Sequence, residues 1–145
     1  MAKKKTAARK KKITRNDEPK GTVLVTGAAG FTGSTTVDLL IEKGYSVVAT
    51  DREDAIFLYV RERQAMVERE GWRYKGQKIE IVPADLTRRE TLRALFRGRK
   101  IRYILHAGAV FDMSAPWKLL YNVNVMGTKN LLEVAADARH VPGAT

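Results

Sequence analysis

Three glycines, at positions 27, 30 and 33, carry the strongest chemical signal in the chain. They lie in the segment Thr26-Gly-Ala-Ala-Gly-Phe-Thr-Gly33, which follows the apolar run Thr22 to Thr26 and opens an amphipathic stretch, Thr35 to Lys43. A strand, a glycine-rich turn and a helix start form an arrangement that binds phosphate, because the unpaired N–H groups and the positive dipole end of the helix face the anion.

Each glycine has a separate task in this arrangement. Gly27 permits a tight turn, Gly30 lets the backbone approach a pyrophosphate, and Gly33 lets the helix and the strand pack closely. The spacing is GxxGxxG, whereas the commonest dinucleotide fingerprint is GxGxxG. A glycine triplet alone is weak evidence, so the assignment depends on the flanking segments.

A carboxylate follows the next apolar run at the distance that a dinucleotide site requires. The run Tyr45 to Thr50 is predicted to be a strand and ends at Asp51, 24 residues after Gly27. An acidic residue about 20 positions past the glycines is where the ribose hydroxyls are bound. Asp51 could also cap the helix that begins near Arg52, and the two roles are compatible. The flanking strand favours ribose binding.

Strands and helices alternate from Gly21 to the end of the chain. The predicted strands are 22–26, 45–50, 78–82 and 102–106, and the predicted helices are 35–43, 54–70, 88–97 and the stretch from 115 onward. Thr87 to Glu90 has the form of a capping box, Ser114 is the expected N-cap of the last helix, and a break is expected at 122–124. This alternation predicts an α/β fold with a doubly wound parallel sheet and about four βα units.

Polar and small residues follow the end of every predicted strand. They are Gly27 to Gly33, Asp51, Asp85 and the Ala107-Gly-Ala109 turn. In doubly wound sheets, ligands bind at the carboxyl ends of the strands, where the strand order reverses. We therefore expect these four features to line one crevice.

These motifs resemble the extended short-chain dehydrogenases/reductases, Rossmann-fold enzymes that include nucleotide-sugar epimerases and dehydratases and the 3β-hydroxysteroid dehydrogenases. The matching segments are TGAAGFTG at 26–33, Asp51, Ala84-Asp-Leu86, His106-Ala-Gly-Ala109 and residues 124–133. Together they cover the chain from about Gly21 to Ala138. The set is specific, although no single member of it is.

The resemblance implies a site for a dinucleotide cofactor. The glycine turn would take the pyrophosphate, Asp51 the adenosine ribose, and Asp85 with Leu86 the adenine. Ala107 and Gly108 would pass beneath the ribose and nicotinamide, and Asn124 matches the family Asn whose helix borders the active site. The expected cofactor-binding residues are Gly27, Ala29, Gly30, Phe31, Thr32, Gly33, Asp51, Arg52, Asp85, Leu86, Ala107, Gly108, Ala109 and Asn124.

Structural roles are open for several of these residues. Asp85 could be a turn residue at a strand end, and Asn124 could be a helix cap. His106 and His140 are interpreted as ordinary residues without a chemical role. Residues 111–117 look weakly closer to the steroid-dehydrogenase side of the family than to the sugar epimerases, although Trp117 could equally be a packing residue.

The charge at the end of the second strand decides the expected cofactor. The Asp51 carboxylate would accept hydrogen bonds from a free ribose 2′-hydroxyl and repel a 2′-phosphate, whereas the neighbouring Arg52 could attract one. We expect NAD rather than NADP.

The family's catalytic groups are missing from this sequence. The reaction moves a hydride between nicotinamide and a hydroxyl or carbonyl group, and a Tyr-x-x-x-Lys pair with a nearby Ser or Thr moves the proton. That pair follows a fifth strand, and this chain ends at Thr145. Tyr74 to Lys78 has the spacing but contains Gly76 and precedes the third strand, so it is interpreted as a loop. No catalytic residue is expected within this chain.

Composition limits the remaining function classes. At 145 residues the chain suits one domain, 21–145, and the absence of cysteine excludes disulfides, cysteine nucleophiles and cysteine-based metal sites. No metal site is expected. No apolar run approaches the roughly 18 residues of a membrane span and no secretory signal is recognisable, so a cytoplasmic protein is expected.

The net charge of +11 is concentrated at the amino terminus. Residues 1–20 carry a net charge of +7, which leaves +4 for the rest of the chain. This segment has almost no apolar content and is predicted to be a disordered basic tail. A solvated tail is favoured over contact with nucleic acid or an anionic surface, and a mitochondrial transit peptide is disfavoured because no apolar helical face is present.

Two classes of function remain. The chain could be the cofactor half of an NAD-dependent epimerase, dehydratase or dehydrogenase, with its domain truncated before the fifth strand and its small-molecule substrate bound by the missing part. Alternatively, it could be a complete module that binds a dinucleotide or a partner without chemistry. The first is favoured, and it predicts an unpaired strand edge that invites association. A homodimer is compatible with the sequence.

The reading frame downstream of codon 145 separates the two classes. The cofactor-half hypothesis predicts an in-frame strand followed by a Ser or Thr and a Tyr-x-x-x-Lys pair, because the family reaction needs these groups. Sequencing the gene and its transcript measures this directly. A genuine stop codon at that position would favour the binding module.

Overall fold

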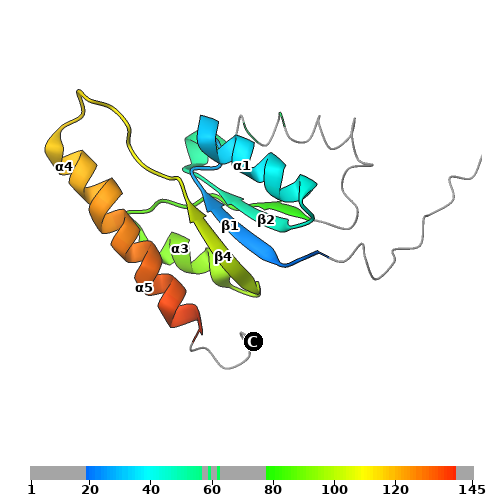
Figure 1. Cartoon of the computed structure of the whole chain (residues 1–145). Helices are drawn as coiled ribbons and strands as arrows, with labels where there is room; N and C mark the ends of the chain where they lie inside the picture. The colour runs from blue at the N-terminus through cyan, green and yellow to red at the C-terminus, as the bar shows by residue number, and fades with distance from the viewer. Residues whose placement is uncertain (1–18, 57–58, 60–61, 63–77, 140–145) are drawn as a thin grey trace, which may run out of the picture.

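Four parallel strands form the centre of the fold. The computed structural model describes residues 19–56, 59, 62 and 78–139 (Figure 1). Within them, β1 (Thr22–Thr26), β2 (Ser46–Thr50), β3 (Ile79–Ile81) and β4 (Ile101–His106) make one sheet in the order β3-β2-β1-β4. All three strand pairs are parallel. The chain order reverses between β1 and β4, which is the position where a doubly wound sheet binds its ligands.

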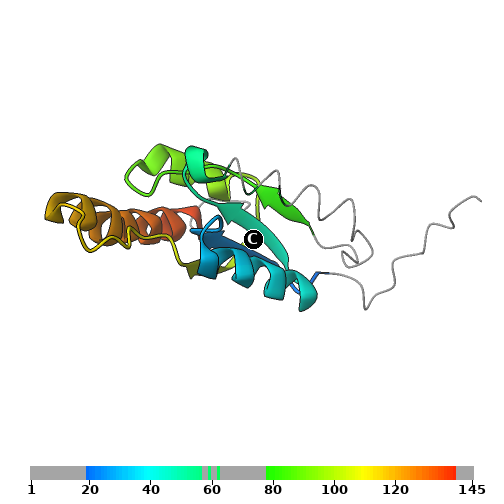
Figure 2. The same ribbon diagram turned by 90° about the horizontal axis from the view of Figure 1, so that it is seen from above.

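Helices cover both faces of this sheet, as Figure 2 shows from above. The helix α1 (Phe31–Glu42) lies on one face, and α3 (Arg89–Phe96) and α5 (Gly127–Arg139) lie on the other. Between β4 and α5, the short helix α4 (Trp117–Leu120) continues without interruption into a π-helix, η3 (Tyr121–Met126). The predicted doubly wound α/β fold is confirmed. No helix of the described residues is long and apolar enough to cross a membrane.

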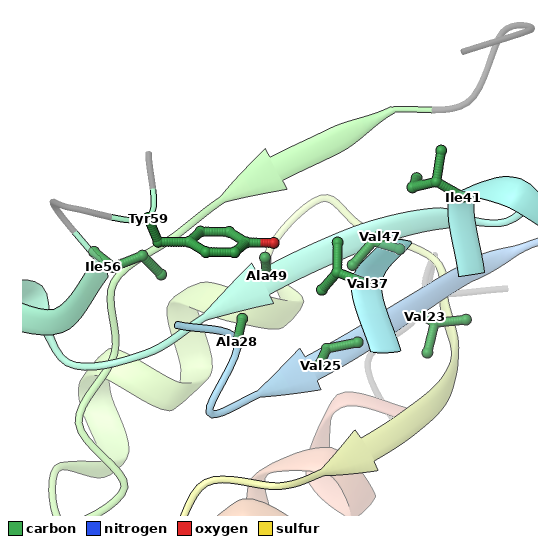
Figure 3. Packing of buried hydrophobic residues seen from close by; sticks show 9 residues of the cluster. All are labelled: Val23, Val25, Ala28, Val37, Ile41, Val47, Ala49, Ile56 and Tyr59. Carbon is green, nitrogen blue, oxygen red and sulfur yellow. The ribbon is translucent and has the colours of Figure 1, made fainter. Parts of the chain in front are cut away.

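The alternation of side chains along the strands creates two cores. Val23 and Val25 of β1 point to the α1 face, where they pack with residues of α1, β2 and the helical residues 56 and 59 (Figure 3). Leu24, between them, points to the opposite face and packs against α3 and α5. Burying a Leu or Val side chain stabilises the folded state by about 1.5–3 kcal/mol. A strand that is apolar on both faces is therefore most stable between two layers of helices.

The predicted elements agree with the structure except at helix starts. The helix α1 begins at Phe31, four residues before the predicted start, because the glycine turn leads directly into it. The second predicted helix is helical at 53–56, 59 and 62, and the remainder of 57–70 lies outside the described residues, as do Tyr74 to Gln77. Ile56 and Tyr59 of this segment are buried.

Two predicted helix caps are wrong. The N-cap of α3 is Arg88 and makes no side-chain cap, because the Thr87 hydroxyl donates to Asp85 Oδ1 instead. The N-cap of α4 is Pro116, and the expected cap Ser114 donates its hydroxyl to Asp112 Oδ1. In both cases an aspartate two residues before the Thr or Ser accepts its hydroxyl in a local turn, which competes with the helix cap. The break expected at 122–124 is the π-helix η3, which widens the helix but does not interrupt it.

The strand β4 forms one edge of the described sheet, and β3 forms the other. Tyr103 and Leu105 of β4 and Leu132 of α5 are exposed large apolar residues. Together with neighbouring residues, Tyr103 and Leu132 line a groove of about 630 Å³ beside that edge. Association through this surface stays a prediction.

Two glycines allow the turn between β1 and α1 to be this compact. Gly27 has φ +67°, a left-handed conformation that disfavours other residues, and a Cβ atom there would lie 2.7 Å from the Ala107 carbonyl carbon and the Gly108 nitrogen. A Cβ atom on Gly33 would collide with the Gly27 carbonyl oxygen. The turn, the start of α1 and the loop after β4 are therefore in direct backbone contact.

We predict that Gly33→Ala destabilises the fold by about 3 kcal/mol or more, because the added methyl group would overlap the backbone of Gly27 and Ala28, which can move away only if the turn and α1 separate. The measurement is the free energy of unfolding from urea denaturation. Gly30→Ala is the matched control, since its Cβ atom would lie 3.3 Å from the Gly27 carbonyl oxygen and its backbone is in an extended conformation. Equal stability of the two variants would contradict this account of the turn.

Candidate functional site

A crevice of about 380 Å³ opens at the carboxyl ends of the strands. It lies where the ends of β1, β2 and β4 and the loop after β3 meet, as the sequence predicts. Of the predicted site residues it brings together Gly27, Asp51, Arg52, Asp85, Leu86, Gly108 and Ala109. The lining also includes residues that were not predicted: Thr26, Thr50, Ala84, Leu92, Val110, Phe111, Asp112, Leu119 and Val123.

The start of α1 is open to an anion. Its N-cap is Gly30, which has no side chain to cap the helix, and its first turn contains no acidic residue. The first N–H groups of the helix therefore lack a side-chain acceptor, and the first turn of the helix itself contributes no negative charge. Phe31 and Thr32 are exposed in the first turn, and Phe31 is 92% exposed. This end of α1 can receive a phosphate group.

Asp51 joins the end of β2 to the glycine turn. Its Oδ2 accepts a hydrogen bond from the Ala29 N–H at 3.1 Å, and its Oδ1 accepts one from the Arg52 N–H at 2.8 Å. Each carboxylate oxygen keeps a further lone pair, so the fixed carboxylate can still accept hydroxyl groups. The next residue, Arg52, forms an exposed ion pair with Asp54 at 3.2 Å. The helix after β2 is assigned from residue 53, and the Arg52 carbonyl accepts its first backbone hydrogen bond, from Ile56. Arg52 is therefore the N-cap of this helix, and Asp51, one residue earlier, is not.

Asp85 and Leu86 form the wall that follows β3. Asp85 Oδ1 accepts hydrogen bonds from the Thr87 N–H and hydroxyl, so Asp85 is the turn residue considered in the sequence as well as a lining residue. The Leu86 carbonyl accepts a hydrogen bond at 3.1 Å from Asn130 Nδ2 on α5. Helix α5 thereby holds the backbone of this wall in place.

The loop after β4 forms the opposite wall. The Gly108 N–H donates to the hydroxyl of Thr26, the last residue of β1, at 3.1 Å. Asn124 clamps Val110 from both sides, since its Oδ1 accepts from the Val110 N–H at 2.8 Å and its Nδ2 donates to the Val110 carbonyl at 3.0 Å. Asn124 therefore positions the loop and is not among the lining residues, and it does not cap a helix.

His106 has more contacts than an ordinary strand-end residue. Its Nδ1 lies 2.6 Å from the Thr26 hydroxyl, and its Nε2 lies 2.9 Å from the Thr128 hydroxyl on α5. Partial burial lowers the pKa of His106 below its ordinary value, which favours the neutral ring. The apolar pattern of β4 gave no hint of these partners, because Thr26 is 80 residues away in sequence.

The remaining predicted residues lie beside the crevice. Ala29 contributes its N–H to Asp51, Gly33 packs beneath the turn, and Ala107 donates its N–H to the Thr26 carbonyl at 3.3 Å. Trp117 is not a buried packing residue, since it is 74% exposed and its ring lies 6.2 Å from that of Tyr121. Among the described residues, no group of three or more His, Asp or Glu could hold a metal ion.

Comparison with known proteins places the chain in a family. A family model described as GDP-mannose 4,6 dehydratase matches residues 24–144. UDP-glucose 4-epimerase 2 of Arabidopsis thaliana is 37% identical over 118 residues, 79% of this chain and 33% of that protein. UDP-glucuronate 4-epimerase 4 of the same plant is 33% identical over 127 residues, 83% of this chain and 27% of that protein. The chain spans about a third of the length of these curated relatives, which are enzymes.

Solved structures show the same fold. A short-chain type dehydrogenase/reductase from Mycobacterium ulcerans has a TM-score of 0.68 at 21% identity, covering 83% of this chain and 47% of its own. A short-chain dehydrogenase/reductase superfamily protein from Agrobacterium tumefaciens, solved with bound NAD, has a TM-score of 0.55 at 28% identity. That match covers 81% of this chain and 29% of the other.

The relatives named above are sugar-nucleotide epimerases. The weak similarity of residues 111–117 to the steroid-dehydrogenase side of the family stays a prediction. The resemblance drawn from the glycine turn, Asp51 and the later motifs is confirmed. The chain belongs to the GDP-mannose 4,6 dehydratase family, within the epimerases and dehydratases of the short-chain dehydrogenase/reductase superfamily.

Proposed function

We propose that the crevice binds NAD and that the chain is the cofactor half of an enzyme that moves a hydride between nicotinamide and a sugar nucleotide. The observation that carries this proposal is the carboxylate of Asp51, held by the Ala29 N–H beside the uncapped start of α1. A fixed acceptor for ribose hydroxyls and an open site for phosphate lie at one edge of the sheet, which is the combination that a dinucleotide needs.

The preference for NAD over NADP rests on charge. A ribose 2′-phosphate next to Asp51 would meet a carboxylate, whereas a free 2′-hydroxyl would donate a hydrogen bond to it. Arg52, the residue that could offset this repulsion, already pairs with Asp54. The NAD-bound relative from Agrobacterium tumefaciens supports the same choice.

Residue roles within the crevice follow the family pattern. The first N–H groups of α1 would bind the pyrophosphate, Asp85 and Leu86 would contact the adenine, and the loop from Ala107 to Ala109 would lie beneath the ribose and nicotinamide. NAD supplies the hydride acceptor when it is bound. The chain's own residues bind and orient it, and the proton-transferring Tyr and Lys would have to come from outside these 145 residues.

A second candidate is a binding module without chemistry. The chain contains the crevice but no Tyr-x-x-x-Lys pair after a fifth strand. The same geometry of Asp51 and α1 supports dinucleotide binding in both candidates, so cofactor titration tests what they share and a turnover assay tests where they differ.

We predict that the chain binds NADH more tightly than NADPH and that Asp51→Asn lowers the NADH affinity about tenfold, since a charge-assisted hydrogen bond is lost. The variant should also reduce the preference for NADH, because the repulsion of the 2′-phosphate disappears. Fluorescence titration with each dinucleotide measures both effects. Asp54→Asn is the matched control, and its exposed ion pair should change the NADH affinity by no more than about twofold. Tighter binding of NADPH by the unaltered chain would refute the cofactor assignment.

We also predict that the chain alone, saturated with NAD, does not convert UDP-glucose into UDP-galactose, because the family's proton-transferring Tyr and Lys would have to come from outside these 145 residues. Chromatography of the reaction mixture after prolonged incubation measures the product. Turnover above a protein-free blank that rises in proportion to the concentration of the chain would mean that the catalytic groups lie within these residues.

A further inference from the structure

Four hydrogen bonds run in one direction from the loop after β4 to helix α5. They join the Gly108 N–H to the Thr26 hydroxyl, Thr26 to His106, His106 to the Thr128 hydroxyl, and Thr128 to the Asn124 carbonyl. The last bond fixes the direction of the two bonds to His106, because the Asn124 carbonyl, 2.6 Å from Thr128 Oγ1, can only accept. The single proton of the Thr128 hydroxyl is thereby committed to Asn124. Thr128 Oγ1 must then accept from the His106 ring nitrogen that lies 2.9 Å away.

This order determines the tautomer of His106. Since Nε2 donates to Thr128, Nε2 carries the proton of the neutral ring and Nδ1 is an acceptor. The Thr26 hydroxyl, 2.6 Å from Nδ1, donates to it and accepts from the Gly108 N–H with its remaining lone pair. Each of the four hydrogen bonds between Gly108 and Asn124 then has one donor and one acceptor. The Asn124 side chain binds the same loop at Val110.

We propose that His106 is a positioning residue of the dinucleotide site, because its neutral Nε2–H tautomer bridges β1 to α5 and so fixes the loop from Gly108 to Val110 that forms one crevice wall. The proposal rests on the proposed function for its ligand, but the hydrogen bonds themselves involve no cofactor. His106 is not among the residues lining the crevice, so it acts through the backbone of Gly108 and Val110.

The alternative is that these bonds only stabilise the fold. The geometry argues against it, since Thr26 is 2% exposed and its hydroxyl is shared between the wall residue Gly108 and His106. Hydrogen bonds aligned donor to acceptor also strengthen one another. Removing the Thr128 hydroxyl should therefore loosen the loop after β4 as well as the helix around Thr128.

Thr128 offers the sharpest test because it lies outside the crevice lining and has two informative replacements. Thr128→Val keeps the shape of the side chain and removes the hydroxyl, whereas Thr128→Ser keeps the hydroxyl. Thr36→Val is the matched control, since the Thr36 hydroxyl makes the same type of bond to the carbonyl four residues earlier, Thr32, without a histidine partner. All four chains should show similar far-ultraviolet circular dichroism.

The expected result is that Thr128→Val weakens NADH binding about fivefold, the typical effect of one hydrogen bond. Thr128→Ser and Thr36→Val should bind NADH like the unaltered chain. Nitrogen-15 NMR of the imidazole should show the Nε2–H tautomer in the unaltered chain and a mixture of tautomers in Thr128→Val. Amide hydrogen exchange at Gly108 should be faster in Thr128→Val alone.

Three outcomes would overturn the proposal. These are an Nδ1–H tautomer in the unaltered chain, equal NADH affinities of the Val and Ser variants, and an equal loss in Thr36→Val. If the unaltered chain binds no NADH, the proposed function fails instead, and the tautomer and the exchange rate at Gly108 still decide whether His106 positions the loop.

Discussion

The backbone contact between Gly27 and Gly33 is the constraint on which the rest of the site depends. It brings the start of α1 against the end of β1, and the same turn lies against Ala107 and Gly108. No side chain could be inserted at either glycine without separating these segments. Because the three segments meet as bare backbone, the uncapped N–H groups of α1, the carboxylate of Asp51 and the loop after β4 share one edge of the sheet. The crevice follows from that close approach.

The continuous helix formed by η3 and α5 supports the other two walls. Asn124 binds Val110, Thr128 binds His106, and Asn130 binds the Leu86 carbonyl, so one helix fixes the loops after both β3 and β4. Its apolar residues Leu131 and Val134 are anchored in the core beneath the sheet. This helix is held in place by its buried apolar face. Its polar side chains therefore keep the residues of the two loops in a fixed geometry.

Sequence reasoning succeeded where local pattern and physical requirement coincide. The strands were recognisable because β1 and β2 are apolar on both faces, and Asp51 was identifiable because a strand end fixes where its side chain lies. It failed where two local interactions compete. Thr87 and Ser114 both precede helices in suitable positions, but Asp85 and Asp112 take their hydroxyl groups. The energies of a cap and of a short turn are similar, so the residue types alone do not decide between them.

By itself, the sequence determined the fold class, the glycine turn between β1 and α1, the position of Asp51 and the family. These depend on periodicity and on residues close together in the chain, where geometry follows from spacing. Only the tertiary structure decided the roles of His106, Thr26, Thr128 and Asn124. Their partners lie up to 82 residues apart, and a hydrogen bond is formed only when both groups arrive within about 3 Å in a defined direction. The packing of β1, β4 and α5 brings these groups to that distance, and no pattern along the chain records it.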